Sequence, residues 1–136
     1  DRPEYLQQMP ESMLLSVDVG HAYHPNYGDK MDPTNQSPLN TGFCIKEASS
    51  QSYATDCRAV AIVEQICRQE EISYTKFFNR SDGTGGSTLG SIASSFLPIP
   101  TVDVGVPLLA MHSSRELMGV KDIRALADMI RAYYTL

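Results

Sequence analysis

The residue types with the clearest capacity for chemistry lie between positions 18 and 24. Asp18 is followed by His21 and His24, and all three come after the apolar run Met13-Leu14-Leu15. A carboxylate and neutral imidazoles are ligands that a divalent metal of the zinc type accepts. On these residues alone, the alternative is that Asp18 caps a turn and both histidines lie exposed in a polar loop.

The elements around these residues are those of an open sheet. Residues 13–18 predict a buried strand, and residues 20–41 predict a long loop, because prolines and glycines interrupt them. A strand followed by polar side chains and a loop is where α/β sheets place ligand sites. The remaining pattern predicts helices over residues 3–9, 54–69, 89–96 and 120–134, and strands over residues 43–47, 74–79 and 101–106. Since strands alternate with helices, we expect an α/β fold with a mainly parallel sheet between helix layers.

Composition bounds the class of protein. The chain has 136 residues, 42% hydrophobic and 20% charged, which is typical of one globular domain. A net charge of −5 disfavours nucleic acid and anionic membrane surfaces as partners. No apolar run reaches the roughly eighteen residues that a membrane span needs, and no signal peptide is visible. Three cysteines without framework spacing favour a reducing, cytoplasmic location, with Cys57 and Cys67 as small core residues of a helix.

Ordered motifs extend over nearly the whole chain. They are His21-Ala22-x-His24-Pro25-Asn26-Tyr27 with Asp18 ahead of it, Ile45-Lys46, Gln51-x-Tyr53-Ala54, Arg80-x-Asp82, Gly86-Ser87-Thr88-Leu89-Gly90, Val102-Asp103-Val104-Gly105-x-Pro107 and Met111-His112-Ser113-x-Arg115-Glu116. In this order they resemble the aspartyl aminopeptidase family, which includes the aminopeptidase I type. The resemblance implies a three-layer α/β/α sandwich of the zinc-peptidase type.

The same resemblance implies that the chain is a partial domain. Residues 1–136 would form the C-terminal part of the metallopeptidase catalytic domain, because the family domain needs more chain than this and no initiator methionine is present. The N-terminal part and the inserted dimerisation domain would lie upstream. The full-length protein is implied to be a homo-oligomer.

The chemistry implied is two-metal hydrolysis of peptides, removing N-terminal residues, acidic ones (Asp or Glu) in particular. Asp18 and His112 would be ligands of different ions in a pair of zinc ions, with manganese or cobalt as alternatives. His21, Lys46 and Tyr53 would contact the substrate. No catalytic residue is expected in the segment itself, because the general base would be a glutamate upstream, so we expect the segment alone to be inactive.

Several points stay open at this level. The protein could be a related dinuclear exopeptidase with neutral specificity, or a non-catalytic assembly module that keeps the fold. Glu70-Glu71 does not match the family's adjacent glutamates, because it follows the strand of Asp18 instead of preceding it. The glycine-rich residues 82–90 lack the Gly-Lys-Ser/Thr ending of a nucleotide loop, which favours a wall of the active site shaped by backbone. His24 could serve the loop or the substrate.

Overall fold

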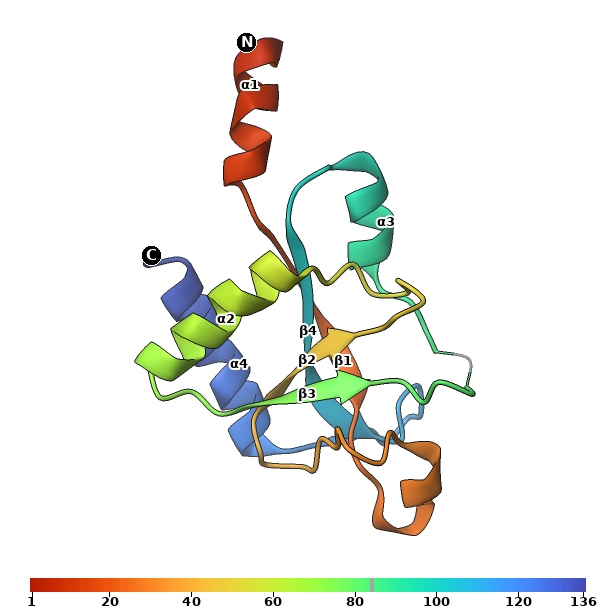
Figure 1. Ribbon diagram of the computed structural model, residues 1–136. Coiled ribbons are helices and arrows are strands. Elements are labelled where there is room, and N and C mark those ends of the chain that lie inside the picture. Colours follow the sequence, from red (N-terminus) through yellow and green to blue (C-terminus); the bar gives the residue numbers. More distant parts are fainter. Residues whose placement is uncertain (84) are drawn as a thin grey trace.

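The computed structural model describes residues 1–83 and 85–136, so Thr84 of the glycine-rich segment lies outside the described residues. Figure 1 shows the arrangement of its elements. The helices are α1 (Arg2–Gln8), α2 (Cys57–Gln69), α3 (Leu89–Phe96) and α4 (Val120–Tyr133), with short 3-10 helices η1 (Met9–Glu11) and η2 (Pro25–Lys30). The strands are β1 (Leu14–His21), β2 (Phe43–Glu47), β3 (Tyr74–Phe78), β4 (Thr101–Leu109) and β5 (Leu117–Met118).

The strands form one sheet in the order β1-β4-β2-β3, and β5 pairs with the end of β4. β1 is parallel to β4 and β2 is parallel to β3, but β2 and β4 are antiparallel. The α/β prediction is confirmed, while the sheet is mixed instead of mainly parallel. The reason is that the connection through α3 brings the chain back into the sheet in the opposite direction, so the two parallel pairs oppose each other.

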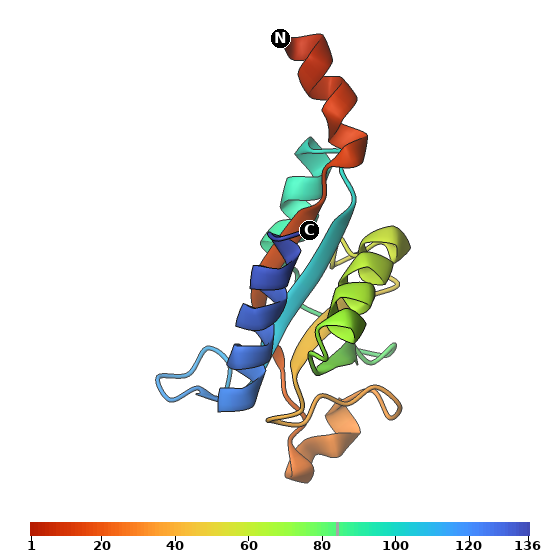
Figure 2. The ribbon, with the colours of Figure 1, turned by 90° about the vertical axis from the view of Figure 1, so that its left-hand side faces the viewer.

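Helices cover both faces of the sheet, as the three-layer prediction requires. Helices α2 and α4 lie together on one face, and α3 lies against β1 and β4 on the other (Figure 2). The alternation in β4 sorts its side chains: Val102, Val104 and Val106 enter the main core under α2 and α4. The opposite face of the sheet, called the α3 face below, is therefore left to the residues between these valines.

Helix α2 starts later than the periodicity indicates. It begins at Cys57 because the Asp56 side chain accepts a hydrogen bond from the Ala59 N–H at 2.9 Å and so caps the helix. Cys57 therefore lies in the exposed first turn, and the prediction that it is a core residue is wrong. Cys67, which lies ten residues further along the helix, is buried as expected.

Strand β1 is longer than predicted. It continues through His21 because β4 also extends, and Gly20 and His21 pair with Pro107 and Leu108. Asp18 therefore lies inside the strand, opposite Gly105, and not at its end. This places the carboxylate over the face of the sheet instead of beyond its edge.

The N-terminal helix stands apart from this sheet. Figure 1 shows α1 extending away from the other elements, and none of its residues is buried. It is held locally by a capping box in which Asp1 and Glu4 exchange hydrogen bonds. Within the described residues, no helix combines the length and the apolar character that crossing a bilayer requires.

Candidate metal and substrate site

Asp18 presents its carboxylate on the α3 face of the sheet. Ser16 on the same strand lies within reach of α3, and side chains two apart on a strand share a face. The Asp18 side chain is 48% exposed, and its Oδ1 accepts a hydrogen bond from the Val19 N–H at 2.8 Å. The carboxylate is thus held by its strand and remains accessible to solvent, which suits an oxygen ligand of a metal ion.

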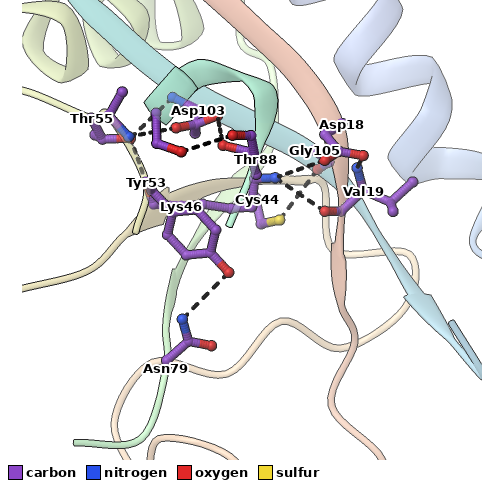
Figure 3. Close-up of polar contacts among 12 residues, drawn as sticks. Asp18, Val19, Cys44, Lys46, Tyr53, Thr55, Asn79, Thr88, Asp103 and Gly105 are labelled. Carbon is purple, nitrogen blue, oxygen red and sulfur yellow. Dashed lines mark hydrogen bonds and ion pairs between the residues drawn. The ribbon is translucent and has the colours of Figure 1, made fainter. Parts of the chain in front are cut away.

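Lys46 reaches Asp18 from another strand. Strand β4 lies between β2 and β1, so the Lys46 side chain spans β4. Its ammonium donates a hydrogen bond to the Val19 carbonyl at 3.1 Å. Nζ lies 4.0 Å from Asp18 Oδ2, although the Lys46 side chain is only 1% exposed (Figure 3). Burial lowers the pKa of Lys46, and the negative charge of Asp18 opposes that shift.

The aromatic ring of Tyr53 packs next to this ammonium. The Lys46 Nζ lies 5.2 Å from the centre of the Tyr53 ring, a cation–π arrangement. Tyr53 is buried, packs edge-on against Phe77, and accepts a 3.4 Å hydrogen bond from Asn79 Nδ2 at its hydroxyl. Lys46 and Tyr53 were predicted together as substrate contacts, and the structure brings them together beside Asp18 (Figure 3).

His21 and His112 come from distant parts of the chain and lie close enough for their charges to interact. His21 ends β1, and His112 lies in the short connection between β4 and β5, which turns back with Ala110 and His112 at positive φ. Burial lowers the pKa of His21, and the proximity of His112 lowers it further. The His112 backbone N–H donates to Glu116 Oε1 at 2.6 Å, which fixes the connection locally.

His24 has a contact that explains it without a ligand. Its Nδ1 accepts a hydrogen bond from the Asn26 N–H at 3.1 Å and so caps η2. Its ring also lies 5.0 Å from that of Tyr27. These contacts favour the loop-structure reading of His24 over a role with substrate.

The donor set fits part of a zinc centre. A carboxylate at Asp18 and an imidazole at His112 are zinc ligands by type. Within residues 1–83 and 85–136, no group of three or more histidine, cysteine, aspartate or glutamate side chains could hold a metal ion. Residues 18 and 112 would therefore supply only some of the ligands of a complete centre.

Asp103 belongs to the same surface and received no role from the sequence pattern. It is fully buried on β4, directly opposite Lys46 in the ladder. The sequence did contain a sign of its position: Asp103 lies between valines that alternate into the core, so its side chain must point to the opposite face of the sheet.

Comparison with known proteins identifies the family of the chain. Residues 1–134 match the model of the family described as aminopeptidase I zinc metalloprotease (M18). The Clostridium novyi protein called "Probable M18 family aminopeptidase 2" is 44% identical over 136 residues, covering 100% of this chain and 31% of the relative. The chain belongs to this family.

Solved structures agree with the family. A chain in the cryo-EM structure of the Ape4 and Nbr1 complex superposes with a TM-score of 0.90 at 32% identity, over 93% of this chain and 24% of that one. The S. cerevisiae mApe1 dodecamer superposes with a TM-score of 0.82 at 26% identity, over 93% of this chain and 27% of that one. The chain thus spans about a third of the length of the curated relatives it matches.

Proposed function

We propose that this chain forms one part of the active site of a metallo-aminopeptidase that removes acidic N-terminal residues from peptides. Membership of the M18 zinc metalloprotease family supports the reaction class. The observation that carries the proposal is that Lys46 Nζ lies 4.0 Å from Asp18 Oδ2 and 5.2 Å from the centre of the Tyr53 ring. His112 follows β4, and its charge acts on His21, which ends the strand that bears Asp18.

Each side chain has a role in this proposal. Asp18 and His112 would hold different ions of a zinc pair, which when bound would polarise the scissile carbonyl and lower the pKa of a water. His21 donates a hydrogen bond to the oxyanion that develops on the substrate. A histidine whose pKa is lowered stays neutral at pH 7, so its protonated ring nitrogen can donate without carrying a charge.

Lys46 and Tyr53 form the specificity side of the site. The buried ammonium lies over the Tyr53 ring in surroundings that exclude water. In such surroundings a negatively charged substrate side chain is strongly favoured over a neutral one. An acidic N-terminal side chain would share the donors that Lys46 now directs at Val19 and Asp18.

One observation favours the alternative of neutral specificity. The Lys46 side chain is almost fully buried, and its ammonium already has a carbonyl and a carboxylate as partners. In that alternative Lys46 serves only to hold Asp18. The two readings differ in whether removal of the ammonium changes the preference between acidic and neutral substrates.

The proposal includes a division of labour. The chain supplies part of the ligands and the substrate contacts, whereas the general base and the remaining ligands come from sequence that the relatives carry outside the matched region. The chain alone is then inactive and binds zinc weakly. We also propose a cytoplasmic location and a homo-oligomeric full-length protein; the dodecamer of the S. cerevisiae relative supports the second point.

A chimera tests the proposal. This chain replaces the matching region of the Clostridium novyi relative, and hydrolysis of peptides with N-terminal Glu, Asp or Leu is measured beside the 136-residue chain alone. We expect turnover of the acidic peptides by the chimera only. Turnover by the chain alone would contradict the division of labour.

Metal analysis of the same chimera separates an enzyme from an assembly module. Asp18→Ala and His112→Ala should each lower the zinc content, while Asp29→Ala, at an exposed carboxylate of η2, should not. Zinc content that is unchanged in both ligand variants would favour the non-catalytic module.

A further inference from the structure

Asp103 is a fully buried carboxylate in the middle of the α3 face. It lies on β4 directly opposite Lys46 of β2, and its relative exposure is 0%. A buried charge is costly unless it is paired and hydrogen-bonded. The partners of Asp103 therefore identify what it holds in place.

The carboxylate joins two segments that are distant in sequence. Oδ2 accepts a hydrogen bond from the Ala54 N–H at 2.7 Å, next to Tyr53, and Oδ1 accepts one from the Thr88 hydroxyl at 2.6 Å (Figure 3). Gly90 lets the first turn of α3 approach, because a Cβ there would lie 2.6 Å from Asp103 Oδ1. The glycine-rich segment (residues 85–90) is thereby anchored to the segment that carries Tyr53.

The backbone of Asp103 adds a third connection. Its N–H donates to the Thr55 Oγ1 at 3.0 Å, and the Thr55 hydroxyl donates to the Lys46 carbonyl at 2.6 Å. At the other end of the glycine-rich segment, a Cβ at Gly85 would meet Asn79, whose amide bonds the Tyr53 hydroxyl. Lys46, Tyr53 and the start of α3 are thus all held through one side chain or its immediate neighbours.

We infer that Asp103 is a positioning residue that locks Lys46, Tyr53 and the glycine-rich segment into one wall of the substrate site. The inference rests on the proposed function for the meaning of that wall, but the locking itself is a property of the fold. The buried carboxylate accepts hydrogen bonds from both Ala54 and Thr88, and Lys46 on the same face carries the charge of opposite sign.

The matched pair Thr88→Val and Thr88→Ser tests the inference in the chimera. Valine keeps the volume and removes the hydroxyl that bonds Asp103, whereas serine keeps the hydroxyl. We expect Thr88→Val to raise KM for a peptide with N-terminal Glu about tenfold, as the loss of one hydrogen bond to a charged group does, with a smaller change in kcat and unchanged zinc content. Thr88→Ser should behave as the parent.

Asp103→Asn keeps the shape and removes the charge. The amide can still accept from the Ala54 N–H and can donate to the Thr88 hydroxyl, so we expect a KM between those of the parent and Thr88→Val. Equal KM values in the parent, Thr88→Val and Asp103→Asn would overturn the inference. A fall in kcat together with loss of zinc would overturn it as well, because that pattern is a general structural defect.

A second measurement does not depend on activity. In the 136-residue chain, hydrogen exchange of the Ala54 amide is followed by NMR in the parent, Thr88→Val and Thr88→Ser. If Asp103 couples the two segments, Thr88→Val accelerates exchange at Ala54 about tenfold and Thr88→Ser does not. Unchanged exchange in Thr88→Val would contradict the coupling, whereas an inactive parent chimera with coupled exchange would contradict only the proposed function.

Discussion

The ammonium of Lys46 lies 4.0 Å from the carboxylate of Asp18 across an intervening strand. The lysine side chain is 1% exposed and the aspartate side chain is 48% exposed, so a buried cation pairs with a carboxylate that is open to solvent. A candidate metal ligand and a candidate specificity residue are therefore in direct contact, and a change at one is expected to affect the other.

Lys46→Met in the chimera should separate these two effects. Methionine approximates the length of the side chain and removes its charge. We expect kcat/KM for N-terminal Glu to fall about tenfold relative to N-terminal Leu, and zinc affinity to fall by about tenfold because Asp18 loses an outer partner. Lys121→Met, at an exposed lysine, is the control. An unchanged ratio of Glu to Leu turnover would support neutral specificity.

His112→Ala should raise the pKa of His21. Burial is the larger cause of its lowered pKa and remains in the variant, so the pKa should move toward 6.5 without reaching it. NMR titration of the imidazole signals in the metal-free chain measures this directly. His24→Ala is the control, because that ring bonds within its own loop. A His21 titration unaffected by His112→Ala would mean that the two imidazoles are not neighbours in solution.

Gly105→Ala should disturb β1 at Asp18. A Cβ at position 105 would lie 2.7 Å from the Asp18 carbonyl oxygen, a backbone atom that cannot move without displacing the strand. We expect a loss of about 1–3 kcal/mol in the free energy of unfolding, measured with urea, and weaker zinc binding by the chimera. Gly86→Ala is the matched control, since nothing lies within 4 Å of a Cβ there. Equal stability of the two variants would contradict this account.

The cysteines should differ in reactivity and in their effect on stability at high pH. Burial raises the pKa of Cys44 to about 12 and that of Cys67 to about 11, whereas Cys57 is exposed. At pH 8 a thiol reagent should modify Cys57 alone in the folded chain.

The sign of the pH effect follows from the raised pKa values. Above pH 9 the unfolded chain releases thiol protons that the folded chain keeps, so the free energy of unfolding should fall as pH rises from 9 toward 11. Cys67→Val should flatten that fall, and Cys57→Ser should not. Urea unfolding at several pH values measures it, and an equal slope in the parent and Cys67→Val would contradict the burial of Cys67.

Much of the fold follows from local patterns. The strand at residues 43–47 and the alternation of Val102, Val104 and Val106 are visible because side-chain periodicity depends only on neighbours in sequence. The extension of β1 to His21 could not be predicted in this way, because it depends on pairing with Pro107 and Leu108 far along the chain. The reversal of direction between β2 and β4 has the same long-range origin.

The candidate site divides in a similar manner. Residue type and motif order identified Asp18, His21, Lys46, Tyr53 and His112, and the structure brings Lys46 and Tyr53 to Asp18 and His112 to His21. The burial of Lys46 was not predictable, because it depends on Gly20 of β1 and the ring of Tyr53, which reach the lysine only in the folded chain. Asp103 was missed for a related reason, since its partners Ala54 and Thr88 adjoin it only in the folded chain.

β1 forms one border of the sheet, and Val17 within it is 49% exposed. On the side away from β4, its main chain offers free hydrogen-bond donors and acceptors to any extended peptide that approaches. The strand that carries Asp18 is thus an edge strand, as β3 is at the opposite border, and we expect strand-to-strand association of the chain in solution by itself.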